Sequence, residues 1–102
     1  MRQLLQRCDA ELHPLVPAES SSPRAREQAR MFNESVADVR AALLEPAKDL
    51  LERGSPNRDL VACLEKSVAE LAFWRRVLRS LHGDALGREP ARAEYLLRYL
   101  TG

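Results

Sequence analysis

The hexapeptide ERGSPN, residues 52–57, separates the two most strongly patterned segments of this 102-residue chain. Gly54 has no Cβ and can adopt the left-handed conformation that often ends a helix. Ser55 is placed to cap a following helix, and Pro56 suits its first position, where the missing N–H costs nothing. The hexapeptide therefore predicts a tight turn between two helices.

The segments on either side of this turn, about 23–53 and 56–82, carry residues at alternating spacings of four and three that form mainly apolar stripes. In the first segment these are Ala25, Ala29, Phe32, Val36, Val39, Leu43, Pro46 and Leu50. In the second they are Leu60, Leu64, Ser67, Leu71, Trp74, Leu78 and Leu81. This spacing puts each set on one face of a helix, so the sequence predicts a long antiparallel helical hairpin.

Further apolar residues beside both stripes indicate that the hairpin has other neighbours. They are Leu44, Leu51, Val61 and Val68. The stretches HPLVPAESSSP (13–23), predicted to be a flexible linker, and HGDALGREP (82–90) set off two shorter helices, about 2–13 and 90–101. We therefore predict a three- or four-helix bundle in which residues 1–102 form a single helical domain.

Composition supports this all-α class. Of the residues, 45% are hydrophobic and 30% are charged, as in globular proteins rather than disordered tails. Isoleucine is absent and Thr101 is the single threonine. Because strands favour β-branched residues, this shortage argues against a sheet.

Pro46 lies inside the longest helical segment, in LLEPAKDLLERG (43–54). It has no N–H for the preceding turn, and its ring crowds the carbonyl group there. A kink or a break is therefore expected near Glu45. A kink would wrap the helix around the core, whereas a hinge or a bend would shape a groove.

The stretch AFWRRVLRS (72–80) combines two aromatic residues with three arginines. At 100° per residue Trp74 falls on the apolar stripe, whereas Phe73 lies away from it in a lane of small residues. The arginines occupy the flank of the stripe, where their stems can cover apolar surface. This flank is either an ordinary solvated surface or a contact for a partner. The candidate contact residues are Phe73, Arg75, Arg76 and Arg79.

Charge gives limited support to nucleic-acid binding. The formal net charge is only +1, so no overall field attracts a polyanion. The C-terminal part is richer in arginine and includes Arg88, Arg92 and Arg98. A small nucleic-acid-binding regulator that uses this part is therefore the alternative function.

Catalytic, cofactor-binding and metal-binding motifs are not recognisable in the sequence. His13 and His82 lie at predicted helix ends, and no Glu-x-x-His motif is present. Cys8 and Cys63 are far apart in helical contexts, which predicts buried, reduced thiols. Cys8 and His82 would form a nucleophile and base only if the fold joined them with an orienting residue. We therefore expect no enzymatic activity, cofactor or metal.

The leading prediction is a cytoplasmic, non-enzymatic helical module for protein–protein interaction. Charges interrupt the N-terminal stretch MRQLLQRCDAELHP, unlike a signal peptide, and no window of about 18 apolar residues predicts a membrane span. An adaptor, a chaperone-like protein or a regulatory subunit would suit such a chain. A homodimer is expected, because a small chain with wide apolar stripes gains by burying them against a second copy.

Overall fold

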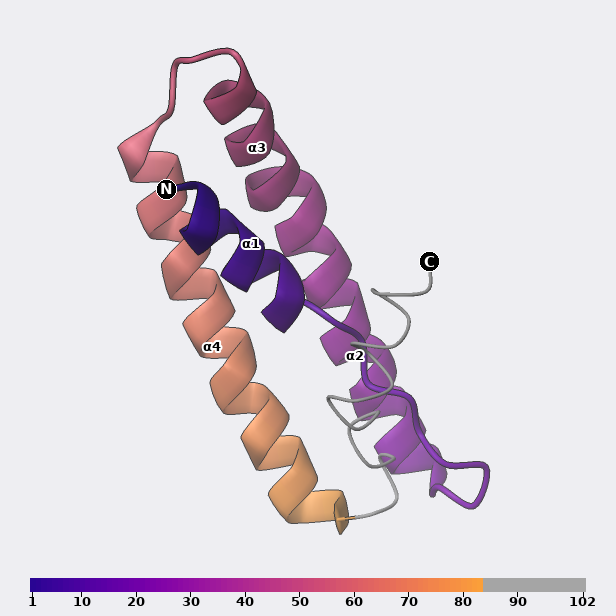
Figure 1. Ribbon diagram of the computed structural model, residues 1–102. Helices are drawn as coiled ribbons and strands as arrows, with labels where there is room; N and C mark the ends of the chain where they lie inside the picture. Colours follow the sequence, from indigo (N-terminus) through magenta and orange to yellow (C-terminus); the bar gives the residue numbers. More distant parts are fainter. Residues whose placement is uncertain (84–102) are drawn as a thin grey trace.

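The computed structural model describes residues 1–83, which form helices and connecting segments, with no strand in that range (Figure 1). The elements are α1 (Arg2–Glu11), α2 (Pro23–Val39), the π-helical turn η1 (Arg40–Leu44), α3 (Glu45–Glu52) and α4 (Arg58–His82). The predicted all-α class is confirmed. The predicted C-terminal helix, about 90–101, lies outside the described residues.

The predicted antiparallel hairpin is the main body of the fold. Elements α2, η1 and α3 follow one another without a break and run beside α4 in the opposite direction (Figure 1). Ser22 caps the beginning of α2 by accepting a hydrogen bond from the Ala25 N–H at 3.1 Å, and Pro23 occupies the first turn. Gly83, at φ +54°, follows the end of α4, as predicted.

The turn between the two long helices is confirmed, but the following helix begins two residues later than predicted. Gly54 is left-handed at φ +72°, and its N–H donates to the Leu51 carbonyl at 3.1 Å. The Ser55 N–H donates to the Leu50 carbonyl at 2.9 Å, which completes a Schellman ending of α3. Because α4 begins at Arg58, Ser55 does not cap it and Pro56 does not occupy its first position, so both of these predictions were wrong.

Asn57 caps α4 instead. Its Oδ1 accepts hydrogen bonds from the backbone N–H groups of Asp59 and Leu60, both at 3.1 Å. Asparagine is among the best residues for this role, because its short side chain reaches the unpaired donors of the first turn.

A π-helical turn, rather than a break, precedes Pro46. The Glu45 N–H donates to the Arg40 carbonyl, five residues back, so η1 holds one more residue than an α-helical turn. A wider turn relieves the crowding that a proline ring imposes on the preceding carbonyl groups. The helix therefore continues through Pro46 into α3.

This extra residue shifts the apolar stripe by one position. Before η1, Ala25, Ala29, Phe32 and Val36 are buried as predicted. From the end of η1 onward the buried positions are Leu44 and Ala47, whereas the predicted Leu43 and Pro46 are only partly buried. A strict heptad repeat across Pro46 was therefore the wrong pattern, because the π-turn adds one residue to it.

Pro46→Ala is expected to keep the fold and to change the free energy of unfolding by no more than about 1 kcal/mol. The substitution restores an N–H but gains little, because proline is already tolerated at the beginning of a helical segment. Urea denaturation followed by circular dichroism measures the change. Loss of the native helical spectrum would mean that the proline itself is needed to hold α3 on the core.

The buried face of α4 also differs from the predicted stripe. Val61, Leu64, Val68, Arg75 and Leu78 are buried. Trp74 and Leu81 are 55% and 66% exposed, so placing them on the core stripe was wrong. The helix is turned so that Val61, Val68 and Arg75 face inward instead of the neighbouring residues Leu60, Ser67 and Trp74.

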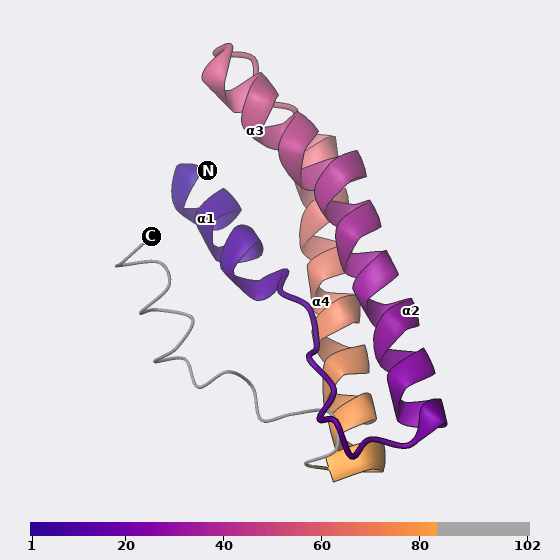
Figure 2. The ribbon, with the colours of Figure 1, turned by 90° about the vertical axis from the view of Figure 1, so that its right-hand side faces the viewer.

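Helix α1 covers one side of the hairpin, between α4 and the end of the long helix (Figures 1 and 2). It buries Leu5 and Cys8 in the core, and Leu12 and Leu15 follow in the connecting segment. Asn33 on α2 accepts from the Leu15 N–H at 2.7 Å and donates to the Leu15 carbonyl at 2.9 Å. The segment before α2 is thus irregular, as predicted, but is packed rather than a free linker.

Candidate interaction surface

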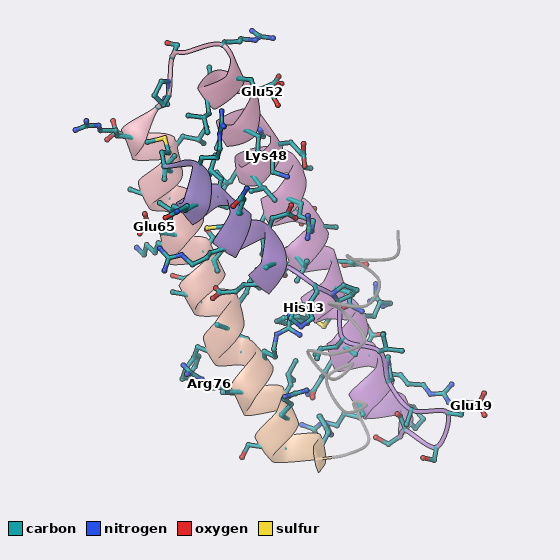
Figure 3. All side chains as sticks on the ribbon, in the orientation of Figure 1. His13, Glu19, Lys48, Glu52, Glu65 and Arg76 are labelled. Atoms are coloured by element: carbon teal, nitrogen blue, oxygen red, sulfur yellow. The ribbon has the colours of Figure 1, made fainter. Side chains whose placement is uncertain are left out.

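The four predicted contact residues do not form one surface. Phe73 is 53% exposed and Arg76 is also exposed, while Arg79 is half-buried. Arg75 is only 8% exposed, so its assignment to an exposed contact surface was wrong. Figure 3 shows Arg76 on the outer side of α4.

Arg75 instead joins α4 to the segment that follows α1. Its Nη2 donates to the His13 carbonyl at 2.5 Å, and its guanidinium carbon lies 4.9 Å from the centre of the Phe32 ring. A guanidinium group stacks well on an aromatic face while its N–H groups bind a carbonyl oxygen. These two contacts explain why an arginine occupies a core-facing position.

Trp74 and Phe73 form an exposed aromatic pair on α4, away from the side on which Arg75 contacts the segment after α1. Their ring centres are 6.0 Å apart, with an interplanar angle of 71°, an edge-to-face arrangement. Met31 on α2 is 57% exposed. Met31 and Trp74 line the same groove, and Phe73 extends the exposed apolar area next to Trp74.

A groove with a volume of about 490 Å³ lies between α2 and α4 next to this aromatic pair. Helix α2 lines it with Gln28, Met31, Phe32, Glu34, Ser35 and Asp38. Helix α4 lines it with Leu71, Trp74 and Leu78. Phe32 and Leu78 are buried and form the floor, while Met31 and Trp74 are the exposed walls.

The groove lies on the side of the hairpin opposite α1. Asn33 faces the segment that follows α1, and Met31 lies about 200° around the helix from Asn33. Figure 2 shows α1 and that segment on one side of α2 and α4. Within residues 1–83, no element covers the opposite side. We call this side, with the groove and Trp74, the open face; Phe73 does not line the groove and lies beside Trp74 on the outer side of α4.

The polar rim of the groove is acidic. Glu34 and Asp38 line it, and among the described residues no lysine or arginine does. Arg30, next to the groove, binds Glu34 and Glu27 at 2.5 Å. The hydrogen bonds from Arg30 hold the pKa of Glu27 below its usual range. Glu34 therefore already has a cationic partner, and Asp38 is the lining carboxylate for which no ion pair occurs within residues 1–83. Because Arg30 is shared between Glu27 and Glu34, the rim stays negative overall.

A second polar cluster, Asp9, Arg40 and Lys48, fastens α1 to the long helix. Arg40 Nη1 and Lys48 Nζ bind the Asp9 carboxylate at 2.7 and 3.0 Å. Arg40 also donates to the carbonyl groups of Asp9 and Leu12, at 2.9 and 2.8 Å. Burial raises the pKa of Asp9, but the hydrogen bonds from Arg40 and Lys48 outweigh this and lower it overall. The cluster has a structural role, because its charges are already paired.

Asp9→Asn is expected to lower the free energy of unfolding at neutral pH by about 1–3 kcal/mol, since charge-assisted hydrogen bonds are lost. The pKa of Asp9 is lower in the folded state than in the unfolded state. Ionised Asp9 therefore stabilises the fold at pH values above its unfolded-state pKa, and this stabilisation is lost as the pH falls through its folded-state pKa. The difference between wild type and Asp9→Asn should therefore shrink below about pH 4. Urea denaturation at pH 7 and pH 3 measures it; an unchanged difference would contradict the ionic role of Asp9.

The cysteines and histidines do not assemble a catalytic group. Cys8 is buried, and burial raises the pKa of its thiol; Cys63 is exposed, so the prediction that both thiols are buried was wrong. His82 does not meet Cys8. His82 hydrogen-bonds Gln28 at the end of α4, whereas Cys8 lies near Glu65, toward the beginning of that helix. His13 Nδ1 lies 3.1 Å from the Ala10 carbonyl, the helix-end contact expected for it. Over residues 1–83 no group of three metal-ligating side chains occurs.

Sequence reasoning missed Met31, Glu34 and Asp38 as surface residues of interest. The signal that could have located this groove is which face of α4 points inward. Two neighbouring sets of residues at helical spacing compete for that face, one with Ser67 and Trp74 and the other with Val68 and Arg75. Hydrophobicity favours tryptophan over arginine inside, so the sequence predicts that the series with Trp74 faces the core. Only the contacts of Arg75 with His13 and Phe32 reverse that preference.

Helices that could cross a membrane are absent from the described part of the chain. Comparison with known proteins adds no relative from which a function could be inferred. No family model, no curated protein and no solved structure matches this chain.

Proposed function

We propose that this protein is a non-enzymatic, cytoplasmic module for protein–protein interaction that binds its partner through the open face. An adaptor, a chaperone-like protein or a regulatory subunit would act in this way. The proposal is supported mainly by the exposed Phe73–Trp74 pair beside the groove. Aromatic residues and methionine are enriched where proteins bind one another. Aromatic rings bury much apolar area with few rotatable bonds, and methionine adapts its shape to its neighbours.

The second support is the division of the hairpin into two sides. One side is covered by α1 and is held by the contacts of Arg40 and Arg75. The other side retains a groove with buried apolar residues at its floor, such as Phe32 and Leu78. A partner can therefore bind to the open face without displacing the core.

Capture from an extract of the source cell tests the function. Wild type, Trp74→Ala and Met31→Asp would be immobilised, and the bound proteins compared by mass spectrometry. Val16→Asp is the matched control, because Val16 is 64% exposed but lies in the segment before α2. Binding that is lost in both groove variants and kept in the control is expected. A set of bound proteins that does not depend on Trp74 or Met31 would refute the proposal.

Phe73→Glu is expected to convert a homodimer to a monomer while leaving helicity unchanged. Phe73 shares an outer lane of α4 with Ala62, Ala69 and Ser80, all exposed, where small side chains permit close approach of a second copy. Arg76→Glu should have a far smaller effect. Light scattering at tens of micromolar measures the mass, and a monomeric wild type would exclude the dimer.

Binding to nucleic acid remains the alternative function. Arg75 is buried, and Arg88, Arg92 and Arg98 lie outside the described residues. Salt dependence separates the two functions, because phosphate contacts release counterions and weaken steeply as salt rises. An apolar helix interface is much less sensitive to salt.

A further inference from the structure

We propose that the occupant of the groove is an amphipathic helix of another protein whose apolar stripe is flanked by lysine or arginine. This inference rests on the proposed function and adds the chemistry of the partner. Helix-in-groove binding needs an apolar floor, a length of several turns and a rim that selects the flanking residues. Each of these requirements can be compared with the residues that line the groove.

The floor and the walls suit the apolar stripe of a helix. Phe32, Leu71 and Leu78 lie at the bottom, and Met31 and Trp74 stand on either side. Methionine is flexible and polarisable, so it adapts to apolar side chains of different shape. A partner would bury both exposed side chains against its own stripe.

The length of the groove suits about three helical turns. It extends along α2 from Gln28 to Asp38, which corresponds to roughly 15 Å at 1.5 Å per residue. Side chains at positions i, i+3, i+4 and i+7 of a bound helix span about 10 Å and fit within this length.

The rim selects the charge of the partner. Glu34 and Asp38 are the ionisable residues that line the groove, and both are exposed. Arg30 already pairs with Glu34, so Asp38 is the main contact for a basic residue beside the apolar stripe of a bound helix. An acidic helix would meet the negative charge of Glu27, Glu34 and Asp38, which Arg30 offsets only in part. Complementary charges at a rim give specificity and faster association more than affinity.

The first measurement uses Trp74 as the reporter, since it is the single tryptophan of the chain. Two synthetic helices of about 14 residues, without aromatic residues, would share one leucine stripe and differ only in lysine or glutamate beside it. The lysine peptide is expected to shift Trp74 emission to shorter wavelength and to bind about tenfold more tightly than the glutamate peptide at low salt. Equal affinities, or no change with either peptide, would overturn the proposal.

The second measurement reverses the charge of the rim. The double variant Glu34→Lys, Asp38→Lys should lose the preference for the lysine peptide. The control Glu52→Lys, Glu65→Lys changes the net charge equally at two exposed residues that do not line the groove (Figure 3). Equal effects of the two double variants would refute a role for the rim.

Other occupants would give different results. Trp74 emission typical of a buried residue in the free protein would indicate residues 84–102 in the groove. Emission that still changes with protein concentration in Phe73→Glu would indicate a second copy in the groove, apart from the dimer contact proposed at Phe73. Either result overturns the partner assignment. If capture still depends on Trp74 and Met31 while the lysine peptide does not bind, the proposed function survives and only the partner is wrong.

Discussion

Leu64→Ala is expected to lower the free energy of unfolding by about 2–5 kcal/mol. Leu64 is fully buried on α4, at 0% exposure, within the core formed by the hairpin and α1. Truncation removes buried apolar atoms and leaves a cavity, because packed neighbours relax only partly. Urea denaturation followed by circular dichroism measures the loss.

Leu81→Ala is the matched control on the same helix. Leu81 is 66% exposed, so the same truncation should change stability by no more than about 0.5 kcal/mol. Similar losses for the two variants would mean that the helix is turned differently from the structure. The pair therefore tests the rotation of α4 directly.

Arg75→Ala is expected to lower the free energy of unfolding by about 2–4 kcal/mol, although it replaces a charged residue. Its hydrogen bond to the His13 carbonyl and its stacking on Phe32 would both be lost. The His13 carbonyl would also lose a strong donor. Arg75→Met keeps much of the apolar stem, so an intermediate loss would separate packing by the stem from binding by the guanidinium group.

Two neighbouring residues provide controls for Arg75. Arg76→Ala, at an exposed position, should change stability by no more than about 0.5 kcal/mol. Trp74→Ala should cost about 2 kcal/mol, because 55% of the residue is exposed and less than half of its apolar area is buried. A larger loss for Trp74→Ala than for Arg75→Ala would restore the stripe predicted from the sequence.

These controls bear on the functional proposal as well. Trp74→Ala is useful in binding experiments only if the variant remains folded. Circular dichroism of this variant therefore has to show native helicity before loss of partner binding is interpreted. Arg75→Ala is not suited to this use, because the residue supports the position of the segment after α1.

The candidate site could be predicted only in part. Phe73 was correctly placed away from the core, because its helical angle differs strongly from that of Leu71 and Leu78. The groove between α2 and α4 could not be predicted, since it depends on how the two helices rotate against each other. The acidic rim follows from this rotation, because Glu34 and Asp38 sit beside the groove only in the observed arrangement.

The sequence by itself determined the all-α class, the antiparallel hairpin and the turn at Gly54. These features depend on local properties: the spacing of apolar residues, the scarcity of β-branched residues and the conformational freedom of glycine. Such properties act within a few residues, so they can be recognised without knowing what lies across the core.

Tertiary structure decided which of two neighbouring registers faces inward. Along the long helix, the π-turn before Pro46 moves burial from Leu43 to Leu44. Along α4, Arg75 is buried in place of Trp74 because a carbonyl group and a ring from distant segments receive its guanidinium group. Contacts between residues far apart in sequence set both choices, and such contacts leave no periodic signal in either segment alone.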